Sequence, residues 1–393
     1  MKDILSLVSY YLPGHKSGGP VRTLSNLVAE VGDRFNFHIV TRDRDFGDSL
    51  AYANIRPGEW NEVAGARVFY CTPHQLTAPG LRRVISSIGY DLLYINGFFN
   101  PIFSIRPALL RRSRLIRRGP CILAPQGEFS PGAFETRWVR KKAYVKLSGA
   151  IGTYGDVSWQ ASSPMERRDI ERHFGADADV HLCADSVSPA LLSKKLAPPE
   201  KRPGRLKVVY LSRIVPKKNL YGAIQLLLSL SGEVEFKIYG AIDDRAYWDR
   251  CLERIRSLPG NISVSYEGVV DHEDVVTVFS RSHVFLFPTL GENFGHVVLE
   301  AMVAGCVPLV GDETPWQDVE RERLGWIMPA SQPELWRSRL QECLNMDQSA
   351  MDSYSNRCRS YARSLIAKGG AAAAFEAMCE KADARFHRRV SDG

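Results

Sequence analysis

Short apolar runs alternate with longer amphipathic stretches along nearly the whole chain. In the first half this pattern predicts strands at residues 4–9, 37–41, 67–70, 92–95, 122–125 and 157–160, the last of these ending the half. Pro20 suits the first position of a helix, so a helix is predicted from there to Glu30. Strands that are apolar throughout, with helices between them, predict a parallel sheet covered on both faces.

The chain changes character at residues 186–207, where four prolines and several lysines interrupt the pattern. We interpret this stretch as an interdomain linker. Beyond it, the pattern predicts strands at 208–211, 235–239, 262–266, 283–287 and 307–310, and helices at 220–231, 245–258 and 294–304. Gly305 stands in the position that ends the last of these helices. The second half is therefore predicted to be a second doubly wound α/β domain.

The expected organisation is a Rossmann-like domain at residues 1–190, a linker at 191–207 and a second Rossmann-like domain at 208–371. An alanine-rich helix at about residues 372–393 is expected to pack back on the first domain. A length of 393 residues agrees with two domains. Two such domains face a cleft, and ligands of these sheets lie beyond the carboxyl ends of the strands.

Composition places the chain among soluble globular proteins, with 45% hydrophobic and 24% charged residues. The eight cysteines form no C-x-x-C pair and no cluster with zinc spacing, which favours reduced thiols in the cytoplasm. The first apolar run is short and no small-residue cleavage site follows it, so a buried strand is favoured over a signal peptide. No run reaches the length of a membrane span.

Positive charge is concentrated between Arg106 and Lys146, where eleven lysines and arginines face two glutamates. This segment carries more positive charge than the chain's net +7, and such a patch favours an anionic partner. Interleaved leucines and Trp138 suggest a surface that lies on anionic lipid or binds a polyprenyl-diphosphate acceptor. Solvated helix faces are the alternative. Nucleic-acid binding is disfavoured, because no recognised module accompanies the charge.

The strongest candidate site is the segment FPTLGENFGHVVLEAMVAGCVPLVGDETP at residues 287–315. The free N–H groups at a helix start form an anion site, and Gly295 would let phosphates approach the backbone. Glu292 precedes this helix start. Glu300 lies in an apolar run, where a carboxylate needs a partner such as a sugar hydroxyl. Taken alone, the two would be read as a helix-start acid and a solvated helix residue.

This segment resembles the signature of the retaining GT-B glycosyltransferases of family four. The matching positions are Pro288, Thr289, Glu292, Phe294, Gly295, Glu300, Ala301, Met302, Gly305 and Pro308. The resemblance implies that Glu292 contacts the donor sugar and that Glu300 holds the ribose hydroxyls. It also assigns Asn293, Phe294, Gly295 and His296 to the donor site.

Two further segments carry the resemblance. In YLSRIVPKKNL, Arg213 and Lys218 have the family's spacing and are expected to meet a leaving diphosphate, while Asn219 stands where glycine is common. Gly240, Gly268 and Val269 resemble the pattern around the nucleotide base, which backbone groups would contact. Ordinary strand-end glycines are an equally weighted alternative.

The resemblance is weaker in the first half. Gly18 and Gly19 match the loop that closes on the phosphates. Asn96 stands where many bacterial relatives have histidine, and asparagine cannot act as a base near neutral pH.

The acceptor is expected to meet Asn96, Gln126 and Glu128. Gln126 replaces an arginine of the family, so a charge role there is in doubt. Glu128 is either within reach of the acceptor hydroxyl or structural.

The resemblance implies retaining transfer of a sugar from a nucleotide-diphosphate donor, UDP-sugar favoured and GDP-mannose possible. The acceptor would be a saccharide or a polyprenyl-diphosphate-linked saccharide in bacterial polysaccharide assembly. No metal and no cofactor are expected, because Asp43/Asp45 and Asp243/Asp244 read as a solvated loop and as a loop or helix start. Arg213, Lys218 and the helix start would supply the positive potential instead.

Other functions compete with transfer. Two carboxylates could hydrolyse a glycoside, but Glu300 lies on an apolar helix face beside the expected diphosphate site. A phosphorylase or epimerase on a related fold is an enzyme alternative. A catalytically degenerate nucleotide-sugar-binding protein is the non-enzyme alternative, and Asn96 and Gln126 argue for it.

Overall fold

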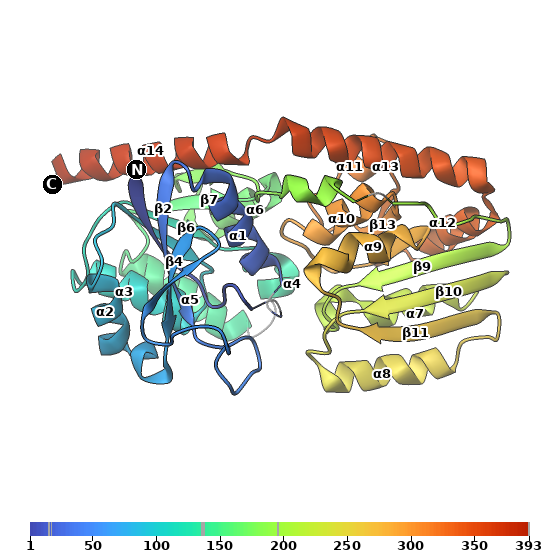
Figure 1. The fold of residues 1–393 in the computed structure, drawn as a ribbon, viewed down its shortest axis with the longest axis horizontal. Helices are drawn as coiled ribbons and strands as arrows, with labels where there is room; N and C mark the ends of the chain where they lie inside the picture. The colour runs from blue at the N-terminus through green and yellow to red at the C-terminus, as the bar shows by residue number, and fades with distance from the viewer. Residues whose placement is uncertain (15, 17, 135–137, 195, 392–393) are drawn as a thin grey trace. The chain divides into compact units, whose positions relative to one another are not determined.

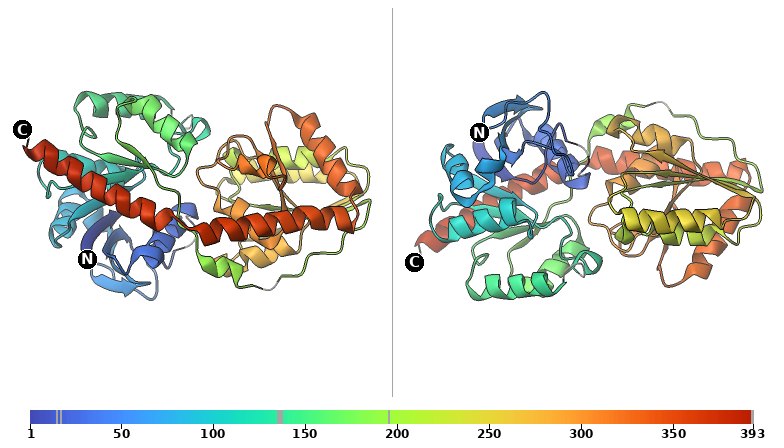
Figure 2. Two further views of the ribbon diagram at one scale, coloured as in Figure 1. Left: turned by 90° about the horizontal axis from the view of Figure 1, so that it is seen from above. Right: turned by 90° about the horizontal axis from the view of Figure 1, so that it is seen from below.

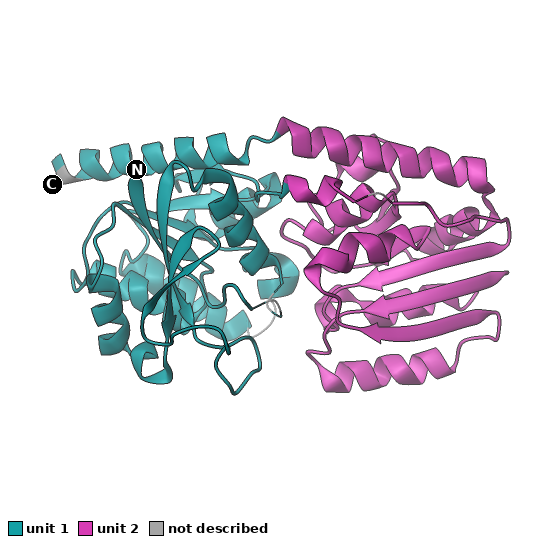
Figure 3. Cartoon of the chain, in the orientation of Figure 1, with its two compact units in different colours: residues 1–188, 369–393 teal, residues 189–368 magenta. Residues whose placement is uncertain are grey.

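The computed structural model describes residues 1–14, 16, 18–134, 138–194 and 196–391, and the chain divides into two compact units. Unit 1 comprises Met1–Ser188 and Gly369–Gly393, and unit 2 comprises Pro189–Lys368 (Figure 3). Each unit is a layered α/β structure with helices on both faces of a sheet (Figure 1).

The sheet of unit 1 has, in its described part, the strand order β3-β4-β2-β1-β5-β6-β7-β8. All neighbours pair in parallel except β3 and β4. The strands are β1 Lys2–Leu7, β2 Phe35–Arg42, β3 Trp60–Val63, β4 Ala66–Cys71, β5 Leu92–Asn96, β6 Cys121–Ala124, β7 Ser158–Ala161 and β8 Val180–Leu182. The helices are α1 Gly19–Val31, α2 Ala78–Ser86, α3 Arg106–Arg112, α4 Pro131–Phe134, α5 Trp138–Ala150, α6 Pro164–Phe174 and α14 Ala371–Ser391.

Two hydrophobic clusters form on the two faces of this sheet. Along β1, Ile4 belongs to one cluster, whereas Leu5 and Leu7 belong to the other. The chain's last helix, α14, contributes Phe375 to the cluster of Ile4, and the Phe375 ring lies edge-on to Tyr94 at 5.6 Å between centroids. Burial on both faces is the reason why these strands are apolar throughout.

The sheet of unit 2 is parallel, with the order β11-β10-β9-β12-β13-β14 in its described part. Its strands are β9 Arg205–Leu211, β10 Glu233–Tyr239, β11 Ile262–Gly268, β12 Val284–Phe287, β13 Val307–Gly311 and β14 Trp326–Met328. Its helices are α7 Leu220–Leu227, α8 Arg245–Arg256, α9 Val275–Ser280, α10 His296–Ala304, α11 Asp318–Arg321, α12 Pro333–Asn345 and α13 Gln348–Lys368. The prediction of two Rossmann-like parallel sheets is confirmed.

Some element predictions were wrong. The strand at 157–160 is not the last of its half, because β8 pairs in parallel with β7. The edge strands β8 and β3 are only partly buried, so they carry too weak an apolar pattern to be recognised. Strand β9 begins inside the predicted linker, since Leu206 is already buried.

In the described part of the chain, no helix is both long and apolar enough to span a bilayer. All eight cysteines are buried and unpaired.

His283 is a buried polar group that joins two parts of unit 2. The Lys207 N–H donates to His283 Nδ1 at 2.9 Å, so the ring proton lies on Nε2, which is 3.0 Å from the Glu200 carbonyl oxygen. Burial lowers the pKa of His283 from its ordinary value to about 4. The neutral ring is therefore part of the folded state.

We expect unit 2 to lose stability as the pH falls, because the unfolded chain binds a proton on His283 near pH 6.5 and the folded chain does not. This contribution is fully present above about pH 6.5 and is lost as the pH falls towards 4, by about 2 kcal/mol at pH 5. Hydrogen exchange of the β9 amides, corrected for intrinsic pH dependence, measures it. His283→Asn keeps an acceptor for the Lys207 N–H without titrating, so an equal pH dependence in this variant would contradict the assignment.

Candidate active site

The candidate residues of the second half all lie in unit 2, at the carboxyl ends of its strands. Arg213 and Lys218 follow β9, and Glu292 follows β12, which is the neighbour of β9 in the sheet. Glu300 lies on α10, the helix that begins after the same loop. Because parallel strands end at one edge, the topology brings together residues that are far apart in the sequence.

An ion pair between Lys218 and Glu292 lies at the centre of this edge. Lys218 Nζ is 2.5 Å from Glu292 Oε2, and the two side chains are only 11% and 16% exposed. Burial would raise the pKa of Glu292, but the charge and hydrogen bond of Lys218, with the charge of Lys217, hold it below its ordinary value. Glu292 is therefore an ionised carboxylate at neutral pH. Lys218 Nζ also lies over the Phe287 ring, 5.6 Å from its centroid.

Asn219 links the two loops that carry this pair. Its backbone is left-handed, with φ 56° and ψ 42°, a conformation that glycine and asparagine tolerate best. This geometry explains why asparagine serves where glycine is common. The side chain caps α7 by accepting from Gly222 N, and its amide donates to the Pro288 carbonyl oxygen at 2.9 Å.

Gly295 sets the start of α10. Its φ is 75°, and a Cβ there would lie 2.8 Å from Glu292 Cγ and 3.1 Å from Trp316 Nε1. The helix consequently begins at His296, two residues after the predicted start at 294. Trp316 holds the preceding residue by donating from Nε1 to the Phe294 carbonyl oxygen at 2.6 Å. The packing brings Gly295, the residue before α10, close to the Glu292 side chain.

Glu300 is buried in α10, with only 2% of its side chain exposed. Its Oε1 is 3.8 Å from His272 Nδ1, whose half-exposed side chain lies in the short helix His272–Asp274 after β11. The sequence analysis missed His272. Its position just beyond the carboxyl end of a strand was the available signal.

Arg213 is half exposed, and its Nη1 is 3.1 Å from Asp243 Oδ2. Asp244 caps α8 by accepting from Tyr247 N at 2.9 Å. Among the described residues, no group of three or more histidine, cysteine, aspartate and glutamate side chains could hold a metal ion.

Gly240 and Gly268 lie side by side at the ends of β10 and β11. A Cβ on Gly240 would lie 1.9 Å from the Ser212 carbonyl oxygen, so only glycine fits there. Gly240 N donates to the Gly268 carbonyl oxygen at 2.8 Å. Val269 follows with 56% of its surface exposed, and Tyr266 OH donates to the Gly240 carbonyl oxygen.

Residues 193–365 match the family described as Glycosyl transferases group 1. The chain carries a glycosyl transferases group 1 domain. The serotype-specific mannosyltransferase WbdA of Escherichia coli is 27% identical over 124 residues, which span 30% of this chain and only 15% of that protein. Like the group 1 match, this likeness covers less than half of the chain.

Solved structures resemble the whole chain. Sucrose-phosphate synthase from Thermosynechococcus elongatus (TM-score 0.72, 16% identity) and HepE of Anabaena in complex with UDP and glucose (TM-score 0.66, 15% identity) both match over the full length of each chain. WaaG, a glycosyltransferase involved in lipopolysaccharide biosynthesis, has a TM-score of 0.61 at 14% identity over 92% of this chain and 95% of that one. These likenesses confirm the predicted GT-B fold.

The other candidate residues lie in unit 1, outside the group 1 domain. Gly18 (φ 69°) precedes α1, and Gly19 is its first residue. Asn96 is buried, with its amide donating to Ser6 Oγ at 3.1 Å. Gln126 is left-handed, with φ 57°. The side chain of Asn96 is thus engaged within the sheet.

Glu128 holds the turn after β5. Its Oε2 accepts from Phe98 N at 2.6 Å and from Phe99 N at 2.7 Å. Burial raises the pKa of Glu128 above its ordinary value despite these two donors. A second carboxylate, Glu166, which the sequence analysis missed, accepts from Gly127 N at 2.6 Å, and burial raises its pKa to about 7.

The basic segment between Arg106 and Lys146 is not one cationic surface, which corrects the prediction. Arg111 is buried and forms an ion pair with Asp156 at 2.8 Å, and Arg118 meets the same carboxylate at 3.1 Å. Arg117 donates to the Tyr90 carbonyl oxygen. Arg137 lies outside the described residues. Several of these side chains therefore have partners within unit 1, and Arg111 is buried there.

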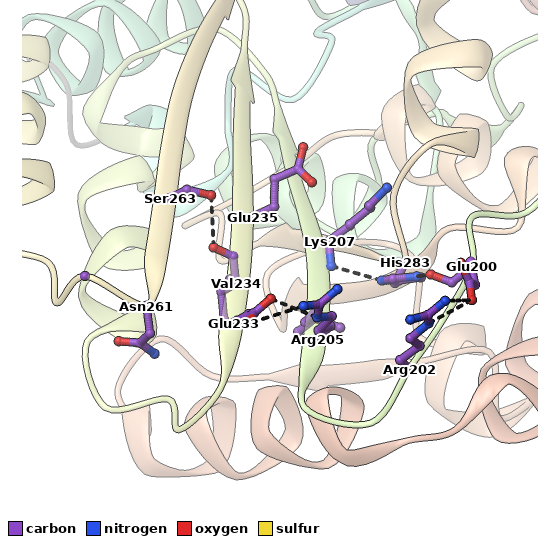
Figure 4. Close-up of a pocket in the computed structure, with 12 residues that line it drawn as sticks. Glu200, Arg202, Arg205, Lys207, Glu233, Val234, Glu235, Asn261, Ser263 and His283 are labelled. Atoms are coloured by element: carbon purple, nitrogen blue, oxygen red, sulfur yellow. Dashed lines mark hydrogen bonds and ion pairs between the residues drawn. The ribbon is translucent and has the colours of Figure 1, made fainter.

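A hollow of about 830 Å³ lies in the group 1 domain at the opposite, amino end of β9, β10 and β11 (Figure 4). Four of its charged side chains pair with each other: Arg205 with Glu233 at 2.8 Å, and Arg202 with Glu200 at 2.7 Å. These mutual pairs, and the distance of one strand length from Glu292, separate the hollow from the candidate active site.

We expect Gly240→Ala to destabilise the group 1 domain far more than Gly268→Ala. Both glycines have positive φ, which costs a non-glycine residue about 1–2 kcal/mol. Only Gly240 also faces a backbone oxygen that a Cβ would strike, whereas Gly268 faces open space. Urea denaturation of the two variants measures the difference. Equal destabilisation would show that the close approach is absent in solution.

Removing one partner of the Lys218–Glu292 pair is expected to lower the free energy of unfolding by about 2–3 kcal/mol, because an uncompensated charge stays in a largely buried position. Lys218→Met should also raise the pKa of Glu292, because burial is then opposed only by the charge of Lys217 and the hydrogen bond from the Asn293 N–H. The measurements are thermal unfolding and carboxyl chemical shifts against pH. The double variant Lys218→Met/Glu292→Leu should recover most of the stability. Additive losses would mean that the pair is not coupled.

Proposed function

We propose that this protein is a retaining, hexosyltransferase-type glycosyltransferase that needs no metal ion. It moves a sugar from a nucleotide-diphosphate donor, UDP-sugar favoured and GDP-mannose possible, to a saccharide or lipid-linked saccharide acceptor in bacterial polysaccharide assembly. The Lys218–Glu292 pair carries the proposal, because it places a cation and an ionised carboxylate together at the ligand-binding edge of the group 1 domain.

In this proposal, positive groups stabilise the charge that develops on the leaving diphosphate. Lys218 and the first N–H groups of α10 are fixed before the donor arrives, and such preorganised charge is usually the largest catalytic term. A bound diphosphate would share the Lys218 ammonium with Glu292. The half-exposed Arg213 would turn to the phosphates from Asp243, whose side chain is only 13% exposed.

The two glutamates would bind hydroxyl groups of the donor. Glu292, kept ionised by Lys218, accepts hydrogen bonds from the transferred sugar, and Glu300 accepts from the ribose. His272 lies beside Glu300 and is half exposed, so we add it to the donor site. The proposal of retention rests on the resemblance of residues 287–315 to retaining GT-B enzymes.

The names of similar proteins support the donor class. HepE of Anabaena was solved with UDP and with UDP-glucose, which favours UDP, and WbdA is named a mannosyltransferase, which keeps GDP-mannose open. A cytoplasmic setting, peripheral on the inner face of the cell membrane, is part of the proposal. The catalytically degenerate binding protein is the second candidate, favoured by the structural engagement of Asn96.

Calorimetric titration with UDP and with GDP, with and without chelator, tests the donor site. We expect micromolar binding of one nucleotide that chelator leaves unchanged and that Glu300→Ala weakens at least about tenfold, since the ribose loses its buried acceptor. Glu235→Ala, at the other end of the sheet, is the matched control and should bind like the wild type.

If neither nucleotide binds, the proposed transferase is wrong. If one binds but the protein neither transfers nor hydrolyses its sugar donor, the degenerate binding protein is the better description. Dependence on a divalent cation would contradict metal-independent transfer.

A further inference from the structure

Helix α5 of unit 1 exposes apolar side chains to an unusual degree. Trp138 is 54% exposed, and Val139 and Leu147 are each 61% exposed. Ile151, just beyond the helix, is 46% exposed. Only Val145 and Ser148 are buried, whereas α1, also of 13 residues, buries six. Leaving several large apolar groups in water on one short segment is unfavourable, which points to an interaction surface.

The same helix carries unpaired positive charge. Arg140, Lys142 and Lys146 are exposed, and none forms an ion pair with a described residue. Residues 138–155 contain no aspartate or glutamate. Unlike Arg111 and Arg118, these three cations are therefore available to an anionic partner.

A hollow of about 560 Å³ lies beside α5, between α4 and α6. Its walls include Phe129, Phe134 and Val145, and the Phe134 ring stacks on His173 at 4.5 Å between centroids. Cationic side chains border it.

These cations are Lys142, Lys146 and Arg172. Trp138, Lys142 and Lys146 are spaced four residues apart, so one stripe of α5 borders the hollow. Apolar walls with a cationic border suit an acyl chain that carries a phosphate.

We propose that α5 and this hollow form a docking surface for an anionic lipid bilayer. The helix, about 20 Å long, lies in the plane of the interface with Val139 and Leu147 among the acyl chains. Lysine stems extend along the apolar layer while their ammonium groups meet lipid phosphates, and Trp138 occupies the headgroup level. Helix α5 runs along the periphery of unit 1 (Figure 2).

An anionic bilayer is complementary to α5 and its hollow in both charge and form. Apolar and cationic side chains alternate along a single helix without acidic residues, which suits a continuous anionic interface. This surface would attach the proposed transferase to a membrane. Only the biological role of the docking surface rests on the proposed function. Vesicle binding and nucleotide binding are separate measurements, so each proposal can fail alone.

Flotation with vesicles tests this surface on the full chain. We compare phosphatidylcholine vesicles with vesicles that also contain phosphatidylglycerol, at low and high salt. The wild type should bind the anionic vesicles and be released by salt, since surface charges are screened. Lys142→Ala/Lys146→Ala should weaken binding at least about tenfold. Leu147→Ala, at a 61% exposed position, should weaken it without unfolding the protein.

Matched controls separate this surface from general charge and hydrophobicity. Lys381→Ala/Arg388→Ala on α14 removes two exposed cations, and Leu50→Ala removes an 80% exposed leucine elsewhere in unit 1. Both controls should bind anionic vesicles like the wild type.

Equal binding by the α5 variants, binding unaffected by salt, or no binding by the wild type would overturn the proposal. Self-association of the wild type that the α5 variants abolish, without vesicle binding, would assign the surface to a second copy of the chain and would also overturn it.

Discussion

The Lys218–Glu292 ion pair is the interaction on which the candidate site depends. It joins residues 74 positions apart, across two neighbouring strands of a parallel sheet. The pair is largely buried, so removing either charge would leave the other uncompensated and destabilise the fold. Their coupling keeps Glu292 ionised despite its burial, and in the proposed function that ionised carboxylate accepts hydrogen bonds from the sugar.

Backbone geometry supports this pair. Asn219 in a left-handed conformation ties the loop after β9 to Pro288, and Gly295 makes the room that Glu292 needs beside Trp316. Both positions have backbone conformations that are unfavourable for most residue types. Such conformations are typical of functional sites, where the surrounding structure compensates for the local strain. Gly240 plays the same part at the ends of β9 and β10, where it permits a contact between backbones.

Charge has different uses in the two units. In the group 1 domain, Arg213 and Lys218 are each paired with a carboxylate beyond the carboxyl ends of the strands. In unit 1, Arg111 forms a buried ion pair with Asp156, whereas Lys142 and Lys146 are exposed beside apolar neighbours. A tally of charges along the sequence treats these cations alike, although burial makes them physically different.

The sequence alone determined the alternation of strands and helices, two Rossmann-like sheets, and the glutamates and basic residues that end up at one edge. Local periodicity and a dense motif carry that information, because buried parallel strands must be apolar throughout. Only the tertiary structure decided that Lys218 pairs with Glu292, that His272 approaches Glu300, and that Glu128 holds a turn. It also decided which cations stay exposed and that edge strands such as β8 exist. Each of these depends on contacts between distant segments, whose energies no local pattern encodes.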